Sequence, residues 1–259
     1  MSEILGVREV SVNFGGLAAL KQVSFGLRKG EIVGLIGPNG AGKTTMFNCL
    51  SGFLKPTAGQ VVFRENAVAH LAPHQIAALG MARTFQTSRV FKRMTVLDHL
   101  LVGGHVHQRA GVWAALRRPA WVGREEASAR ERGLKALAFF GDELTPFLED
   151  FADTLSYANK RRLEIARALV AEPKLLLLDE PTAGMNPHES AGVVDLVRTV
   201  RDAGVTVLLI EHDMRVIMGV SERIIVLDHG EKIAEGRPEE IRANDKVIQA
   251  YMGRRHGRA

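Results

Sequence analysis

Apolar residues fall into two kinds of short run along the chain. In residues 4–12 and 23–27 they partly alternate with polar residues, which predicts a pair of strands forming an antiparallel flank. Residues 32–36, 175–178 and 205–210 are almost continuously apolar, as in strands that are buried on both faces. Helical stretches separate these three strands, so the pattern predicts an α/β fold built on a parallel sheet.

A different pattern begins at residue 103 and continues to about residue 154. Its apolar residues have helix-like spacing among Arg and Glu, which predicts a mostly helical subdomain inserted into the sheet domain. Thr95, followed three residues later by Asp98, predicts the N-cap of a preceding helix. The charged stretch 124–132 is expected to be a solvated helix face rather than a binding surface.

The composition places the chain among folded globular domains. Its 259 residues are 46% hydrophobic and 24% charged, which excludes disordered, collagenous and coiled-coil classes. We expect no membrane-spanning segment and no signal peptide, because no apolar run approaches about 20 residues and the N-terminus is acidic. The net charge of +5 suits nucleic acid, phosphorylated ligands or an anionic membrane, and does not choose among them. The single Cys49 is predicted to be a buried thiol.

One segment has the phosphate-loop pattern G-x-x-x-x-G-K-S/T, between a predicted buried strand and a helix beginning near Lys43. Its residues are Gly37, Pro38, Asn39, Gly40, Ala41, Gly42, Lys43 and Thr44. Glycines let successive backbone N–H groups turn toward phosphates, and the helix N-terminus adds partial positive charge. Lys43 is expected to reach the β and γ phosphates, and the Thr44 hydroxyl to ligate Mg²⁺. A plain glycine-rich turn would require neither side chain.

The predicted strand at 175–178 ends in two carboxylates, Asp179 and Glu180. One carboxylate can hold the Mg²⁺ shell, and the next, on the other side of the chain, can orient or deprotonate an attacking water. Adjacent acids at a strand end are often only solvated. The phosphate loop in the same chain is what gives this pair a functional interpretation.

The order of these motifs resembles the nucleotide-binding subunits of ABC transporters over nearly the whole chain. Residues 155–159 (Leu-Ser-Tyr-Ala-Asn) and the helix-like run 160–169 are similar to the family's signature loop and the helix behind it. The resemblance implies a P-loop NTPase core with a mixed or parallel sheet, an N-terminal antiparallel flank and the helical insertion. A single domain, 1–259, would then contain a helical subdomain at about 87–170 and a short C-terminal extension at about 240–259.

The resemblance also implies roles for individual residues, with ATP and Mg²⁺ as cofactors. Catalysis would involve Glu180, the switch His212 and the Q-loop Gln86, and the metal ligands would be Thr44, Gln86 and Asp179. ATP contacts would come from the aromatic Phe14, from Gly37, Pro38, Asn39, Gly40, Ala41, Gly42, Lys43, Thr44 and Thr45, and, acting on the partner subunit's nucleotide, from Ser156.

Within the family, the resemblance is strongest to ATP-binding subunits of branched-chain amino acid importers. Their pattern appears in residues 156–167, 183–187, 210–214 and 250–253. It implies an ATPase powering solute import at the cytoplasmic face of the bacterial inner membrane, as a peripheral subunit. Expected partners are a second homologous ATPase subunit, forming a heterodimer, two integral-membrane permease subunits and, indirectly, a periplasmic or extracellular solute-binding protein, with no nucleic acid.

Three alternatives stay open at this point. Urea or amide importers and the lipopolysaccharide exporter ATPase have similar sequences, and a soluble relative acting on ribosomes or DNA would suit the basic pI of about 9.5. A metal cluster of His99, His105 and His107 matches no trusted zinc spacing, so a solvated helix end is expected there.

Ala158 stands where the signature has glycine, and if that position needs φ > 0 the alanine costs about 1 kcal/mol.

Overall fold

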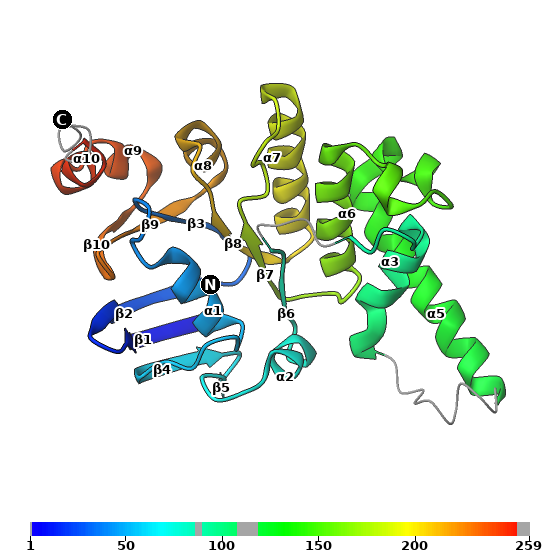
Figure 1. Cartoon of the computed structure of the whole chain (residues 1–259), viewed down its shortest axis with the longest axis horizontal. Coiled ribbons are helices and arrows are strands. Elements are labelled where there is room, and N and C mark those ends of the chain that lie inside the picture. The colour runs from blue at the N-terminus through cyan, green and yellow to red at the C-terminus, as the bar shows by residue number, and fades with distance from the viewer. Residues whose placement is uncertain (1, 86–89, 108–118, 253–259) are drawn as a thin grey trace.

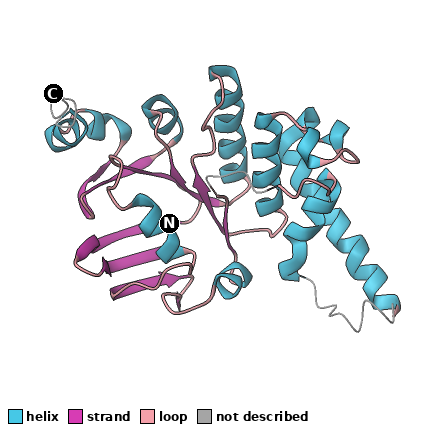
Figure 2. Cartoon of the chain, viewed as in Figure 1, coloured by secondary structure: helices cyan, strands magenta, loops and turns pink. Residues whose placement is uncertain are grey.

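Two sheets form the left and central part of the structure, and most of the helices lie above the larger sheet or to its right (Figures 1 and 2). The computed structural model describes residues 2–85, 90–107 and 119–252. The smaller sheet is antiparallel, in the order β2-β1-β4-β5. Its strands are β1 (Glu3–Phe14), β2 (Leu17–Arg28), β4 (Ala58–Phe63) and β5 (Asn66–Ala67).

The larger sheet has the order β10-β9-β3-β8-β7-β6. Its strands are β3 (Ile32–Ile36), β6 (Met81–Arg83), β7 (Leu175–Asp179), β8 (Thr206–Ile210), β9 (Arg223–Asp228) and β10 (Glu231–Gly236). All neighbours are parallel except β10, which is antiparallel to β9 at one edge.

The predicted α/β fold with an antiparallel flank is confirmed. The three strands predicted to be buried on both faces are β3, β7 and β8, with bounds that differ by at most one residue. Five of the described strands, β4, β5, β6, β9 and β10, were not predicted. The sequence of β9 does contain the pattern of a buried strand, because Ile224–Leu227 is a continuously apolar run like those of β3, β7 and β8. All four of its side chains are fully buried.

Helix α1 (Lys43–Leu50) is enclosed between the two sheets, where its Met46, Phe47 and Cys49 pack with strands of both. Cys49 is buried as predicted. Burial raises the pKa of its thiol to about 11, so the thiol is protonated at neutral pH. Alternate residues of β7 explain why that strand is apolar throughout. Leu175 and Leu177 belong to the hydrophobic cluster that contains α1, whereas Leu176 and Leu178 belong to a second hydrophobic cluster.

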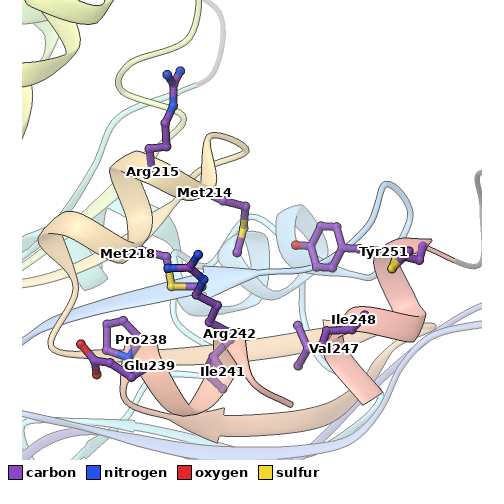
Figure 3. Close-up of a pocket in the computed structure, with 11 residues that line it drawn as sticks. Met214, Arg215, Met218, Pro238, Glu239, Ile241, Arg242, Val247, Ile248 and Tyr251 are labelled. Carbon is purple, nitrogen blue, oxygen red and sulfur yellow. The ribbon is translucent and has the colours of Figure 1, made fainter. Parts of the chain in front are cut away.

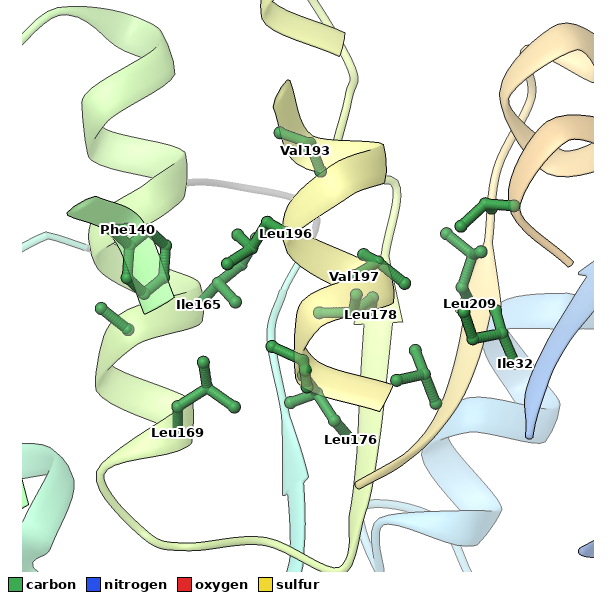
Figure 4. Packing of buried hydrophobic residues seen from close by; sticks show 14 of the residues in the cluster. Ile32, Phe140, Ile165, Leu169, Leu176, Leu178, Val193, Leu196, Val197 and Leu209 are labelled. Atoms are coloured by element: carbon green, nitrogen blue, oxygen red, sulfur yellow. The ribbon is translucent and has the colours of Figure 1, made fainter. Parts of the chain in front are cut away.

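This second cluster joins the larger sheet to α6 and α7 (Figure 4). The helices are α1 (Lys43–Leu50), α2 (Pro73–Ala78), α3 (Val96–Gly103), α5 (Ala120–Leu137), α6 (Tyr157–Leu169), α7 (Pro187–Asp202), α8 (Met214–Val220), α9 (Pro238–Arg242) and α10 (Asp245–Met252). Short 3₁₀ helices are η1 (Gly104–His107), η2 (Ala138–Glu143), η3 (Thr145–Phe147) and η4 (Ala152–Thr154).

Helices α3, α5 and α6 pack together beside the larger sheet (Figure 1). The predicted N-cap of α3 is confirmed: the Asp98 N–H donates to Thr95 Oγ1 at 3.1 Å, and the Thr95 N–H donates to Asp98 Oδ2 at 3.0 Å. The expected solvated face of 124–132 is also observed on α5, which buries only small and aliphatic residues on its other side.

The expectation of a solvated end at His99 is wrong. His99 is fully buried, its Nδ1 lies 2.8 Å from the Thr95 carbonyl, and its Nε2 accepts the Phe91 N–H at 2.8 Å. His105 and His107 are exposed. The part of the chain that the structure describes contains no group of His, Cys, Asp and Glu suited to a metal ion. Nor does any described helix have the length and apolarity needed to cross a membrane.

Candidate active site

The carboxyl ends of β3, β8 and β7 meet at one edge of the larger sheet. Their register places Leu35 of β3 and Asp179 of β7 level with Ile210 of β8. The phosphate-loop residues follow β3, Glu180 follows β7, and His212 lies in the loop after β8. Parallel sheets bind ligands at this edge because loops of different strands converge there. The topology therefore brings three segments that are far apart in sequence to one place.

Backbone geometry accounts for the glycines of the phosphate loop. Gly42 caps α1 with φ of 103°, and a Cβ there would lie 2.8 Å from the Ala19 carbonyl oxygen and from Leu20 Cδ2. A Cβ at Gly37 would lie 2.1 Å from the Leu227 carbonyl oxygen. Both positions therefore require glycine on steric grounds. The loop passes too close to β2 and β9 to admit any side chain there.

Lys43 begins α1 and its side chain folds over the loop. Its Nζ donates to the carbonyl oxygens of Gly37 at 2.6 Å and Pro38 at 3.0 Å. The side chain is buried, so this ammonium group is held by the loop itself. A buried cation beside a helix N-terminus is an arrangement suited to an anionic ligand such as a phosphate.

Glu180 and His212 face each other across the site. The Glu180 Oε1 lies 2.5 Å from His212 Nε2, and the Glu180 N–H donates to the Ile210 carbonyl at 3.0 Å. Glu180 has φ of 50°, a left-handed conformation that is uncommon for a residue other than glycine and costs about 1–3 kcal/mol. A carboxylate held in a strained conformation against an imidazole has the composition of a general-base pair.

These segments enclose one cavity of about 670 Å³, a volume that suits a nucleotide-sized ligand. Its lining includes most of the predicted site residues: Phe14, Asn39, Gly40, Ala41, Gly42, Lys43, Thr44, Thr45, Glu180 and His212. Phe14 is half exposed at the tip of the β1–β2 hairpin. Its aromatic face is therefore available at the cavity rim.

Asp179 does not line this cavity. Arg83 Nη2 lies 3.1 Å from Asp179 Oδ2, and both side chains are buried. Burial raises the pKa of the Asp179 carboxyl, and the neighbouring guanidinium opposes that shift. The Asp179 N–H also donates to Thr84 Oγ1 at 3.3 Å, which ties the end of β7 to the segment after β6.

Besides Asp179, three predicted residues that the structure describes, Gly37, Pro38 and Ser156, do not line the cavity. Gln86 lies outside the described residues. Ser156 caps α6, accepting the Asn159 N–H at 3.2 Å.

The sequence argument about Ala158 is wrong in its premise. Ala158 lies in the first turn of α6, where backbone φ is negative, and it is not among the residues with positive φ. Its side chain is buried. Because the position is helical, glycine would not relieve strain there.

Three residues that contribute to the site were not predicted. Glu211 is buried, and its Oε1 accepts the Thr182 N–H at 2.8 Å and the Thr182 hydroxyl at 2.6 Å, which fixes the loop after Glu180. A charged residue directly after an apolar strand was the available signal. Lys21 and His229 also line the cavity, but no pattern around them in sequence indicates this.

A second cavity of about 720 Å³ lies among α8, α9 and α10, lined largely by methionine and aliphatic side chains (Figure 3). None of the predicted site residues lines it. Tyr251 connects it to the phosphate loop: burial raises the pKa of this phenol to about 12, and the backbone of Gly37, beside the hydroxyl, opposes the shift. The Tyr251 side chain of α10 therefore reaches the backbone of the phosphate loop.

Comparison with known proteins gives two family matches. Residues 20–183, more than half of the chain, match the ABC transporter family. Residues 231–257 match a C-terminal family described as branched-chain amino acid ATP-binding cassette transporter.

Several curated relatives align over nearly their full length. The LivG protein of Salmonella typhimurium, named a high-affinity branched-chain amino acid transport ATP-binding protein, is 46% identical over 96% of this chain and 98% of its own. LivG of Escherichia coli is 44% identical over the same shares. BraF of Pseudomonas aeruginosa, which carries the same description, is 43% identical, again over 96% and 98%.

Solved structures agree with these matches. A nucleotide-free ATP-binding cassette from an ABC transporter has a TM-score of 0.84 and 34% identity, over 97% of this chain and all of that one. A structure of the ADP conformation of an ATP-binding cassette of an ABC transporter has a TM-score of 0.85 and 33% identity, over 98% of this chain and all of that one. With this fold, this site and these relatives, the chain belongs to the ABC transporter family.

Proposed function

We propose that this chain is the ATP-binding and ATP-hydrolysing subunit of an importer for branched-chain amino acids. The observation that carries the proposal is one cavity that contains both a phosphate loop and the Glu180–His212 pair. The substrate class is supported by the descriptions of the relatives and by the match over residues 231–257.

In this proposal ATP lies along the phosphate loop with its base against Phe14. Lys43 exchanges its bonds with the Gly37 and Pro38 carbonyls for phosphate oxygens, and backbone N–H groups at the start of α1 supply further donors. Phe14 offers an apolar aromatic face to the adenine. The residues present therefore suit a nucleotide triphosphate at both of its ends.

Thr44, Asp179 and Gln86 would hold Mg²⁺, which supplies charge neutralisation at the phosphates. Hydroxyl, carboxylate and amide oxygens are the donors that Mg²⁺ prefers. Thr44 lines the cavity, and Asp179 lies at the neighbouring strand end with its carboxylate fixed by Arg83.

Glu180 would accept a proton from the attacking water, and His212 would orient Glu180 and the γ-phosphate. Their separation of 2.5 Å keeps the carboxylate in a defined direction, and Glu211 holds the loop that follows it. General-base catalysis of this kind contributes about 10²–10⁴-fold to a rate.

The partners would be a second, homologous ATPase subunit in a heterodimer and two permease subunits in the membrane, with a solute-binding protein outside. Ser156, away from this chain's own cavity, would complete the site of the second ATPase subunit. The chain would work as a peripheral subunit at the cytoplasmic face of the bacterial inner membrane. Phe91 is half exposed close to Gln86 in sequence and is the apolar residue we expect to contact the permease.

Transport by a reconstituted assembly tests the proposal. The chain would be combined in proteoliposomes with a permease, a second ATPase subunit and a solute-binding protein of the same transport system. Uptake of labelled leucine and of labelled urea would then be compared, with ATP inside the vesicles. We expect ATP-dependent leucine uptake that Glu180→Gln abolishes. Urea uptake, or leucine uptake that Glu180→Gln leaves unchanged, would contradict it.

A further inference from the structure

Arg83, at the end of β6, joins three parts of the site through one guanidinium group. Its Nη1 donates to Asn48 Oδ1 and Ser51 Oγ, each at 2.8 Å, and both acceptors belong to the C-terminal end of the helix that begins at the phosphate loop. Its Nη2 faces Asp179 Oδ2 at 3.1 Å. The two nitrogens thus bind two different elements, α1 and the end of β7.

Aromatic side chains enclose the same guanidinium. Its central carbon lies 5.5 Å from the ring centre of Phe47, 5.9 Å from that of Phe53 and 5.1 Å from that of Phe85. Cation–π contacts at these distances stabilise the positive charge of the guanidinium and restrict the orientation of its plane. The side chain is only 7% exposed, so the Asp179 contact is protected from solvent.

We infer that Arg83 is a positioning residue for the magnesium site, which it serves by fixing the Asp179 carboxylate relative to helix α1. The inference rests on the proposed function, in which Thr44 at the start of α1 and Asp179 at the end of β7 are metal ligands. A ligand set distributed over two elements works only when those elements keep a fixed separation. Arg83 is the side chain that contacts both.

The planar fork of arginine is required for this role. Lysine carries the same charge, but its single ammonium group is compact and lacks the two rigidly separated donors that reach α1 and β7 together. Arg83→Lys therefore keeps a buried cation beside Asp179 and removes the link to α1. Removing a partner that orients a metal ligand costs about 10–100-fold in metal affinity.

The experiment measures ATP binding to the intact chain by calorimetry, once with excess Mg²⁺ and once with EDTA. The quantity compared is the gain in ATP affinity that Mg²⁺ produces. We expect Arg83→Lys to lower this gain at least about tenfold and to leave the affinity in EDTA within about twofold of wild type. A merely structural role would lower both affinities together.

Arg223→Lys is the matched control. Arg223 lies on β9 of the same sheet, is 21% exposed and pairs with Glu31 and Glu235, away from the magnesium ligands. The same chemical change there should alter thermal stability without altering the Mg²⁺ gain. An equal loss of that gain in both variants would overturn the inference.

A second variant covers the case in which Arg83→Lys does not fold. Asn48→Ala removes one acceptor from Nη1 and leaves the Asp179 contact in place. We expect the Mg²⁺ gain to fall about fivefold, the effect of one hydrogen bond. If the Mg²⁺ gain in ATP affinity is unchanged in Asn48→Ala, or in a folded Arg83→Lys, the inference is overturned. If the wild-type chain binds no ATP, or its ATP affinity does not rise with Mg²⁺, the proposed function is overturned instead.

Discussion

Replacing Glu180 by Gln should separate ATP binding from ATP turnover. The amide has the shape of the carboxylate, keeps a hydrogen bond to His212 and preserves the backbone at φ of 50°, so we expect the fold and the cavity to persist. The amide cannot accept the proton of an attacking water. The change therefore removes one chemical capacity from the site and little else.

The expected loss in turnover is about 10²–10⁴-fold, the contribution of a general base, which corresponds to about 3–5 kcal/mol in the barrier. Phosphate release by the assembled transporter measures turnover, and calorimetry with MgATP measures binding. His212→Ala provides a comparison: because the two side chains lie 2.5 Å apart and act together, the double variant should lose little more than Glu180→Gln alone. Turnover of Glu180→Gln within tenfold of wild type, or a comparable loss of ATP binding, would refute the assignment.

Three further predictions concern single positions. Gly42→Ala should destabilise the fold by at least about 1–2 kcal/mol, because φ is 103° and the new Cβ would lie 2.8 Å from the Ala19 carbonyl oxygen. A Cβ at Gly40 would meet no atom within 4 Å, so thermal unfolding should show a smaller loss of stability for Gly40→Ala. Ala158→Gly should lower stability in urea by about 1 kcal/mol, since glycine weakens helix α6, and should not raise assembled ATPase activity; a rise would restore the argument from positive φ. With a thiol pKa raised to about 11 by burial, Cys49 should resist maleimide at pH 8 in the native protein and react in denaturant, and rapid native labelling would contradict its burial.

The sequence predicts those parts of the fold whose physical cause is local. Strand β3 and the N-cap at Thr95 both follow from short patterns, and the structure has them. The edge strand β10 was missed because four of its six residues are polar or glycine and its position depends on β9.

The site is predictable where a motif carries it, and not where the contact is long-range. Asp179 stands out in sequence, but its partner Arg83 is 96 residues away and becomes visible only when β6 pairs with β7. His99 shows the same limit, because its burial depends on the packing of α3 against α5 and α6 rather than on its neighbours in sequence. The helical position of Ala158 is different, because it follows from the cap at Ser156, which is a local contact.

Binding of ATP to the Lys43→Ala variant tests the central claim most directly. Lys43 is held over the phosphate loop by two carbonyl oxygens, and its removal takes away the buried cation that a triphosphate would contact. Calorimetry should show one MgATP bound per wild-type chain and an MgATP affinity lowered about 10–100-fold in Lys43→Ala. Lys21 is an exposed cation that lines the same cavity, and Lys21→Ala should change the MgATP affinity less than about threefold. Equal MgATP affinities for wild type and Lys43→Ala would contradict the assignment of this cavity as the ATP site.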